Sequence, residues 1–331
     1  GAVVDLLKGI DMDKADTDDV QRTDALDMAD QLRAIAEQQG QAHYSPHEAH
    51  IDLSNVVDIV NDTIYCLTHI GRPQTAVTLK DAVDMLTDAL GPDHPDTLLA
   101  RNNLAGAYVD AGNPQKAIDM YEALLPDPTR VLGPNHLHTL TTRNNLAGAH
   151  QQAGHLSTAI DMYKALLADE IRILGPDDPV TLATRGNLAL AHQQAEHIST
   201  AIDMYKALLA DEIRVLGPDH PDTLITRGNL ATAHRDAGHL STAIDMHQAL
   251  LTDRTRVLGP DHPDTLTTRN NLATAHRDAG NLPKVIALRL RAALANKARI
   301  PGPDHPKEGI VSSTLPTPQK DIWRRRNRKS R

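Results

Sequence analysis

The sequence predicts an all-α solenoid of stacked antiparallel helix hairpins, and three observations support this fold class. Variants of the segment Gly-Pro-Asp-His-Pro recur every 42 residues, beginning at Gly91, Gly133, Gly175, Gly217 and Gly259. Aromatic residues make up 2% of the chain and Phe is absent, which favours thin layers of Ala, Leu, Ile, Val and Met over one thick core. Within each period the apolar residues follow helical spacing.

The first helix of each unit is expected to follow the Gly-Pro-Asp-His segment. In the unit that starts at residue 92, Pro95 suits the first helical position because its φ is preset and it has no N–H to leave unpaired. Gly112 is expected to end this helix. The residues on its apolar stripe are Leu98, Leu104, Ala105 and Tyr108.

The second helix of that unit is expected to run from Pro114 to Leu132, where Gly133-Pro134 stops it. Its apolar side is expected to hold Ala117, Ile118, Tyr121, Leu124, Leu125 and Val131. Pro126 and Pro128 lie inside this helix and predict a bend, because proline removes a backbone donor and clashes with the preceding turn. Two such helices cannot bury both faces alone, so consecutive hairpins must stack.

Three regions follow from this pattern. Residues 49–301 form the expected array, with a weak unit at 49–91, five strong units at 92–301 and a last helix from Pro283 to Arg299. Residues 1–48 are acidic, with a helix expected from Thr23 to Gln39 that caps the array. Residues 302–331 read as a disordered basic tail.

Charge is distributed unevenly along the chain. The net charge is −9, but residues 320–331 carry seven basic groups and one acid, which leaves −15 for residues 1–319. Such a body repels nucleic acid and anionic membranes. Nucleic-acid or membrane contact is therefore expected, if anywhere, only at Arg324–Arg331, and the alternative is a solvated tail that folds back on the acidic body.

The composition also indicates a compartment. No apolar run reaches the ~18 residues that a membrane-spanning helix needs, and the N-terminus lacks a basic segment followed by a long apolar stretch. Cys66 is the only cysteine, which excludes an intramolecular disulfide and a Cys-rich zinc site. A cytoplasmic protein is expected. The chain begins at Gly1, which is compatible with a piece of a longer protein.

Several blocks resemble the tetratricopeptide repeat, namely Leu-Ala-x-x-Tyr, Gly112 and Ala117-Ile118. The 42-residue period and the Asn-Asn-Leu-Ala block look most like its kinesin-light-chain subtype, which is common in actinobacterial proteins. The resemblance implies a right-handed α-α superhelix without cofactor that binds a protein or extended peptide in a concave groove lined by the first helices. Because the actinobacterial type often follows a signalling nucleotide-binding module, a sensing arm of a larger regulator is the alternative.

The first helix of each strong unit has an Asn directly before the Leu of its Asn-Leu-Ala block. The resemblance implies that this Asn lines the groove. Carboxamides both donate and accept hydrogen bonds, so a row of them can hold an extended peptide backbone. The structural alternative is that each Asn bonds a neighbouring helix. The candidate peptide-binding residues are Asn102, Asn103, Asn144, Asn145, Asn187, Asn229, Asn270 and Asn271, with Gln152, Gln194, Arg235 and Arg277 near the helix ends.

Basic residues also recur with the period. Arg101, Arg143, Arg185, Arg227 and Arg269 are expected to bury their stems and pair with Asp or Glu. The histidines His94, His220 and His262 are expected to start helices, whereas His150, His192, His234 and His276 stand where the repeat usually has Tyr.

Neither a metal site nor a catalytic site is predicted. Equivalent His in stacked hairpins lie about 10 Å apart, whereas zinc needs its nitrogen ligands within about 2.1 Å, so a row of them cannot form one site. Phosphate-loop, His-Glu-x-x-His and Gly-x-Ser-x-Gly motifs are absent from the sequence, so an enzyme is not expected.

Overall fold

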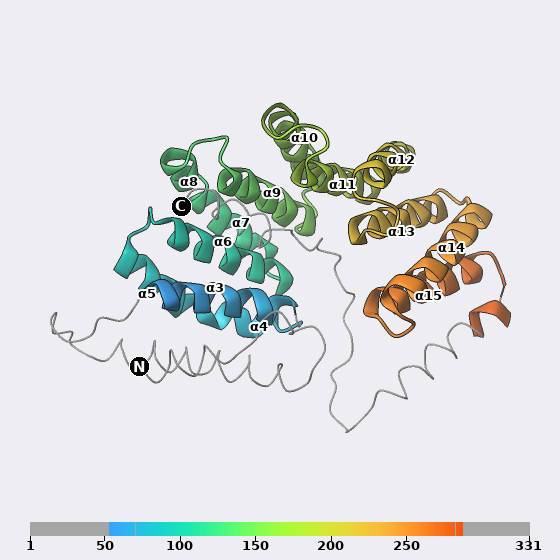
Figure 1. Cartoon of the computed structure of the whole chain (residues 1–331), viewed down its shortest axis with the longest axis horizontal. Helices are drawn as coiled ribbons and strands as arrows, with labels where there is room; N and C mark the ends of the chain where they lie inside the picture. The colour runs from blue at the N-terminus through green and yellow to red at the C-terminus, as the bar shows by residue number, and fades with distance from the viewer. Residues whose placement is uncertain (1–52, 70, 282, 287–331) are drawn as a thin grey trace, which may run out of the picture. The chain divides into compact units, whose positions relative to one another are not determined.

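The computed structural model describes residues 53–69, 71–281 and 283–286, and every element in these ranges is helical (Figure 1). The chain divides into two compact units, with the boundary between Thr158 and Ala159. The acidic segment 1–48 with its expected helix Thr23–Gln39, the tail 302–331 and most of the helix expected at Pro283–Arg299 lie outside the described residues.

The first unit contains the weak repeat, the first strong repeat and the first helix of the second strong repeat. Its described elements are α3 (Leu53–His69), α4 (Pro73–Ala76), η2 (Val77–Leu79), α5 (Lys80–Leu90), α6 (Pro95–Asp110), α7 (Pro114–Leu124), α8 (Pro126–Val131) and α9 (Leu137–Gln152). Helix α10 (Leu156–Ile173) contains the boundary. The expected start of a first helix at Pro95 is confirmed, as is its end just before Gly112.

The second unit repeats the same hairpin with little variation. Its elements after α10 are α11 (Pro179–Gln194), α12 (Ile198–Val215), α13 (Pro221–Asp236), α14 (Leu240–Leu258) and α15 (Pro263–Asp278). The first helices α11, α13 and α15 each have 16 residues. The 42-residue period of the sequence is therefore a period of the structure.

Each strong first helix begins at a side-chain cap supplied by the Gly-Pro-Asp-His segment. The Nδ1 atom of His94 accepts a hydrogen bond from the backbone N–H of Asp96 at 3.3 Å, and His220 and His262 do the same for the residue two places on. Asp178 replaces His in one unit, and its carboxylate accepts from Val180 at 2.9 Å. The expectation that His94, His220 and His262 start helices is confirmed.

At the prolines the expected second helix is divided into two helices by a single residue, Leu125, which keeps a right-handed helical conformation (φ −56°, ψ −35°). Helix α7 ends at Leu124, and α8 begins anew at Pro126, whereas α12 and α14 continue through the equivalent positions. Pro126 has no N–H to donate to the preceding turn, so the helix is interrupted there. Val131 was expected on the apolar side but is 39% exposed, because it lies in the last turn, beyond the buried stripe.

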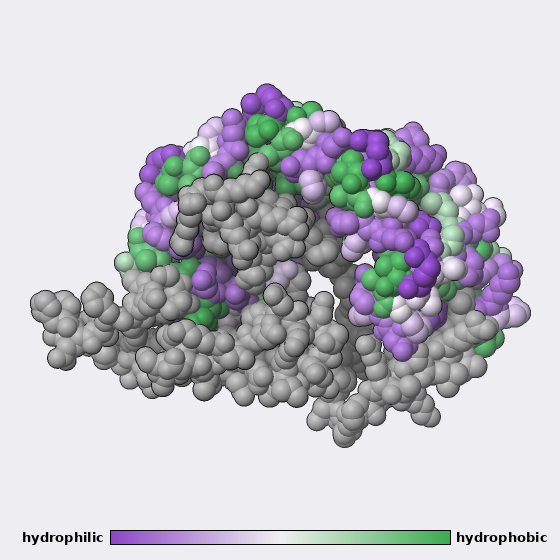
Figure 2. All heavy atoms as spheres, in the orientation of Figure 1, coloured by the Kyte–Doolittle hydropathy of each residue, from purple (hydrophilic) through white to green (hydrophobic). Residues whose placement is uncertain are grey.

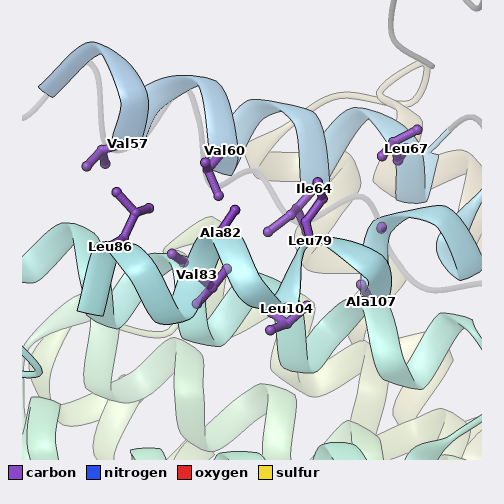
Figure 3. Close-up of a cluster of buried hydrophobic side chains, with 12 residues drawn as sticks. Val57, Val60, Ile64, Leu67, Leu79, Ala82, Val83, Leu86, Leu104 and Ala107 are labelled. Atoms are coloured by element: carbon purple, nitrogen blue, oxygen red, sulfur yellow. The ribbon is translucent and has the colours of Figure 1, made fainter. Parts of the chain in front are cut away.

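The core of each unit is a seam between helices. In the first unit, Val57, Val60 and Ile64 of α3 point toward the side chains of Leu79, Ala82 and Leu86 from η2 and α5, with Leu104 of α6 below them (Figure 3). In the second unit, Tyr205 of α12 is buried with Ala189 of α11 and Leu230 of α13. Small Ala side chains let the helices approach closely, so few rings are needed.

First helices of successive hairpins lie side by side within each unit. Helix α6 contacts both α3 and α9 in the first unit, and α13 contacts both α11 and α15 in the second. The second helices contact the first helix on either side: α12 packs against α11 and α13, and α14 against α13 and α15. This arrangement creates a row of first helices in each unit, and the candidate site residues lie on it.

Candidate protein-binding face

The asparagines of the first unit bond one another across neighbouring first helices. Asn103 of α6 donates through Nδ2 to Oδ1 of Asn61 of α3 at 3.1 Å, and Asn145 of α9 donates to Oδ1 of Asn102 at 3.3 Å. Asn61 occupies the equivalent position in the weak unit, so the row begins one hairpin earlier than the sequence indicated. The structural alternative, in which these carboxamides tie hairpins together, therefore holds for these pairs.

Asn102 does not lie on an open face. It is 6% exposed, and its Oδ1 also accepts a hydrogen bond from the hydroxyl of Thr142 at 3.4 Å. Successive helical residues are rotated by about 100°, so Asn102 faces α9 while Asn103 faces α3. The expectation that Asn102 contributes to an exposed peptide-binding surface is wrong, because its side chain is buried in hairpin stacking.

The remaining asparagines differ in exposure. Asn270 is exposed, whereas Asn103, Asn144, Asn145, Asn187, Asn229 and Asn271 are half-buried. Within the residues that the structure describes, the Asn229 carboxamide makes no hydrogen bond with the protein.

The candidate residues near the helix ends lie at the surface. Gln152 and Gln194 are exposed. Arg235 donates to the neighbouring Asp236 carboxylate at 2.7 Å, and Asp236 also accepts from Gln193 of α11 at 2.7 Å. Arg277 makes the same contact with Asp278, at a longer 3.4 Å. The second unit thus carries a polar link between α11 and α13 at this end of the row.

Three of the five repeated arginines pair with aspartate as expected. Arg101, Arg185 and Arg227 each bond an Asp of the second helix 26 residues later, at 3.0, 2.8 and 2.8 Å, and their side chains are 25%, 20% and 23% exposed. The stems are thus largely covered while the guanidinium groups are paired. Arg269 instead donates to the backbone oxygen of Pro260 at 3.3 Å.

A second arginine extends each ion pair into a short network that the sequence analysis did not identify. In the second unit, Arg214 donates to Asp211 at 3.0 Å and to Asp177, which lies in the loop before α11. Arg130 and Arg256 occupy the same position and pair with Asp93 and Asp219. The sequence pattern that could have predicted these pairs is an Arg that recurs 37 residues after the Asp of Gly-Pro-Asp segments.

Buried polar groups within the hairpins were also missed. Thr97, Thr139, Thr181, Thr223 and Thr265 are all 0–1% exposed. The hydroxyls of Thr139 and Thr223 donate to the backbone oxygens of Gly133 and Gly217 at 2.8 Å, which closes the loops before α9 and α13. The hydroxyls of Thr97, Thr181 and Thr265 are buried without a hydrogen-bond partner in the described structure. Their strict recurrence every 42 residues was the available signal.

On the face shown in Figure 2, hydrophilic residues cover much of the described region, and hydrophobic residues form small groups between them. No described helix is both long and apolar enough to cross a membrane. Among the described residues there is also no cluster of three or more His, Cys, Asp or Glu side chains suited to a metal ion.

The chain matches models of a known protein family. Two family models described as tetratricopeptide repeat match the chain, one at residues 65–126 and the other at residues 139–180, 181–222 and 223–264, together more than half of its length. A comparison with curated proteins finds no match.

Several solved structures share the fold. The kinesin light chain TPR-like repeats of Podosopora anserina are 22% identical, with 63% of this chain and 97% of that chain covered and a TM-score of 0.54. BtubC (BKLC) of P. vanneervenii is 18% identical, with 78% and 99% covered and a TM-score of 0.53. The Cut9–Hcn1 hetero-tetramer of APC/C is 16% identical, with 81% and 43% covered and a TM-score of 0.51.

The repeat period, the paired helices and the matched family models agree with one another. The architecture is an all-α repeat superhelix, as the sequence predicted, and its solved neighbours include kinesin-light-chain-like repeats. The chain belongs to the tetratricopeptide repeat family.

Proposed function

We propose that the chain is a non-enzymatic scaffold that binds an extended segment of another protein along the row of first helices in its second unit. Tetratricopeptide repeat families are generally protein-interaction scaffolds, and the Cut9–Hcn1 structure shows this fold within an assembly. The observation that carries the proposal is the recurrence of half-buried carboxamides, Asn187, Asn229 and Asn271, at one position of neighbouring first helices.

These asparagines recur once per hairpin, and this spacing suits an extended peptide backbone better than a compact ligand. An extended chain presents alternating N–H and C=O groups, and a carboxamide can pair with either of them. In the first unit the equivalent asparagines already bond one another, which shows that this position reaches between neighbouring first helices.

Side chains at the helix ends determine which peptides this face selects. In the second unit Gln194 is exposed there, and Arg235 and Arg277 present guanidinium groups, each beside an aspartate. Gln152 takes the same repeat position in the first unit as Gln194 and is also exposed. An arginine already paired with Asp236 or Asp278 can still donate through its remaining N–H groups. The face therefore offers donors and acceptors with little net charge at this end.

A peptide-display library selected on the full chain tests the proposal. A selected peptide is expected to bind about tenfold more weakly to the variant Asn229→Ala with Asn271→Ala, because two backbone contacts are lost. The matched control is Gln115→Ala with Gln248→Ala, which removes two exposed carboxamides from the second helices α7 and α14. Equal affinity of both variants, with unchanged melting temperatures, would contradict the proposal.

A further inference from the structure

Three hairpin turns each bring two histidine side chains together. In each turn the first histidine lies in the last turn of a first helix, and the second lies five residues later, just before the second helix. The pairs are His150 with His155, His192 with His197, and His234 with His239. Their Nδ1 atoms lie 3.3, 3.2 and 3.3 Å apart, respectively.

The backbone fixes this proximity. The N–H of His155 donates to the carbonyl of His150 at 2.9 Å, and the N–H of Gly154 donates to Gln151 at 3.1 Å, which together make a Schellman turn. The 2.9 Å bond recurs from His197 to His192 and from His239 to His234. In this turn the first and last side chains meet, so the two rings of each pair are placed together by the helix end itself.

The distance between the two Nδ1 atoms of each pair matches the distance between two nitrogen ligands of one zinc ion. Zinc binds imidazole nitrogen at about 2.0–2.1 Å, and tetrahedral geometry then sets two such nitrogens about 3.3 Å apart. The second histidine of each pair is exposed, whereas the first is half-buried. Water can therefore reach the remaining coordination positions, and little rearrangement of the turn is required.

We propose that each of these turns is a two-histidine site for a divalent transition-metal ion such as zinc, with water completing the coordination. Each site lies within one turn and does not join different hairpins. Equivalent histidines of different hairpins lie too far apart to bind one ion, whereas two histidines five residues apart in one turn lie close enough. Imidazole is a preferred ligand of zinc, nickel and copper ions.

Neighbouring charges rank the sites. Glu122 lies beside the first pair, with its Oε1 atom 4.0 Å from Nε2 of His150. At the equivalent positions the other two pairs have Lys164 and Lys206, whose charges help lower the pKa values of His192 and His234 after the larger effect of burial. A cation is attracted to the first turn and repelled from the other two. The turn with His150 and His155 is therefore the tightest site.

Calorimetric titration of the full chain with Zn²⁺ near neutral pH tests the assignment. The decisive variant replaces His155, His197 and His239 with Asn, the residue that closes the same turn at Asn113 and Asn281. The matched control replaces His94, His220 and His262 with Asn, which removes as many imidazoles from surface positions and still caps the helices. We expect Zn²⁺ affinity to fall at least about tenfold in the first variant and to stay unchanged in the control.

Two results would overturn the proposal. One is wild-type protein that binds no Zn²⁺ more tightly than about 1 mM, and the other is a turn variant that binds as well as the control. A second experiment does not remove any histidine. In a chain that keeps only the His150–His155 pair, Glu122→Lys is expected to weaken Zn²⁺ binding about threefold to tenfold. An unchanged affinity would contradict the placement of the ion beside Glu122.

Discussion

Arg214 donates two hydrogen bonds to the Asp177 carboxylate, from Nη1 at 2.9 Å and from Nη2 at 2.6 Å. This contact ties the last turn of α12 to the loop that precedes α11, so it closes the hairpin at its open end. The same two residue types meet in the hairpin that ends at Arg256, which pairs with Asp219 at 3.0 and 2.6 Å. A bidentate pair of this kind is more directional than a lone lysine contact.

The first prediction concerns this closure. The Arg214 guanidinium lowers the pKa of the Asp177 carboxyl, so its contribution to stability is present above the ordinary aspartate pKa and is lost as pH falls through the lowered value. Asp177→Asn is expected to reduce the melting temperature slightly at neutral pH and low salt, because both partners are exposed. High salt should shrink the difference. The exposed Asp245→Asn is the control, and equal melting of both variants at low salt would contradict the role of the pair.

The second prediction concerns His247, which replaces a repeated tyrosine. Its equivalents Tyr121, Tyr163 and Tyr205 are buried, and His247 is 0% exposed with no hydrogen-bond partner for either ring nitrogen within the described structure. Burial, followed by the charges of Arg235 and Arg254, lowers the pKa of His247 to about 4. The unfolded chain therefore binds the proton more readily, and stability is lost as pH falls from about 6.5 toward 4.

His247→Tyr restores the residue of the other hairpins and is expected to stabilise the chain by at most about 1 kcal/mol at neutral pH, because one buried hydroxyl, which is also unpaired in Tyr205, replaces two unpaired ring nitrogens. The acid-induced loss of stability between about pH 6 and pH 4 should become shallower. Denaturant unfolding at several pH values measures both effects. A variant with the same pH dependence as wild type would show that His247 is not buried in its neutral form.

Local features of the fold could be predicted from sequence because their signals are local. Pro95 and His94 fix the start of α6 within a few residues, and Pro126 interrupts the following helix by removing one backbone donor. These predictions do not depend on which hairpins contact each other. The helix starts and the broken helix therefore follow from the residues alone.

The candidate site was harder to predict because it depends on how hairpins face each other. Asn102 and Asn103 are adjacent in sequence, yet one bonds α9 and the other α3. The carboxylate of Glu212 was overlooked because charged residues are rarely buried, and nothing in its local sequence indicates the neighbouring helix. The histidine pairs depend on the turn geometry at the helix end, which spacing alone did not suggest.

The third prediction concerns the turn before α12, where Glu196 has a φ of 60°. The other turns place Gly112, Gly154, Gly238 and Gly280 here, with φ values of 75–80°. A left-handed backbone costs a side chain with a Cβ about 1–2 kcal/mol, partly offset by the flexibility that Gly adds to the unfolded chain. Glu196→Gly should therefore stabilise the chain by about 0.5–1 kcal/mol in denaturant unfolding.

The reciprocal variant provides the control for this strain. A Cβ at Gly154 would meet no atom within 4 Å, so Gly154→Glu introduces the backbone cost without a steric clash. It should destabilise the chain by a similar amount. If both variants changed stability in the same direction, the left-handed conformation would not be the cause.

The fourth prediction concerns Glu212 of α12, which is 3% exposed. Burial raises the pKa of its carboxyl to about 7, although a hydrogen bond with Thr226 of α13 and the charge of Arg185 oppose the rise and Asp222 adds to it. The folded chain therefore holds this proton more tightly than the unfolded chain does. The resulting stability is present below the ordinary glutamate pKa and is lost as pH rises through about 7.

Glu212→Gln keeps the shape of the protonated side chain and cannot ionise. Near pH 5 its stability should lie close to that of wild type, whereas near pH 8 it should exceed wild type by about 1–2 kcal/mol, because only wild type must then bury a charge or release it to water. Denaturant unfolding at both pH values measures the difference, with the exposed Asp203→Asn of the same helix as control. If Glu212→Gln were less stable than wild type near pH 8, the carboxylate would be stabilised by its ionised contacts, and the raised pKa would be wrong.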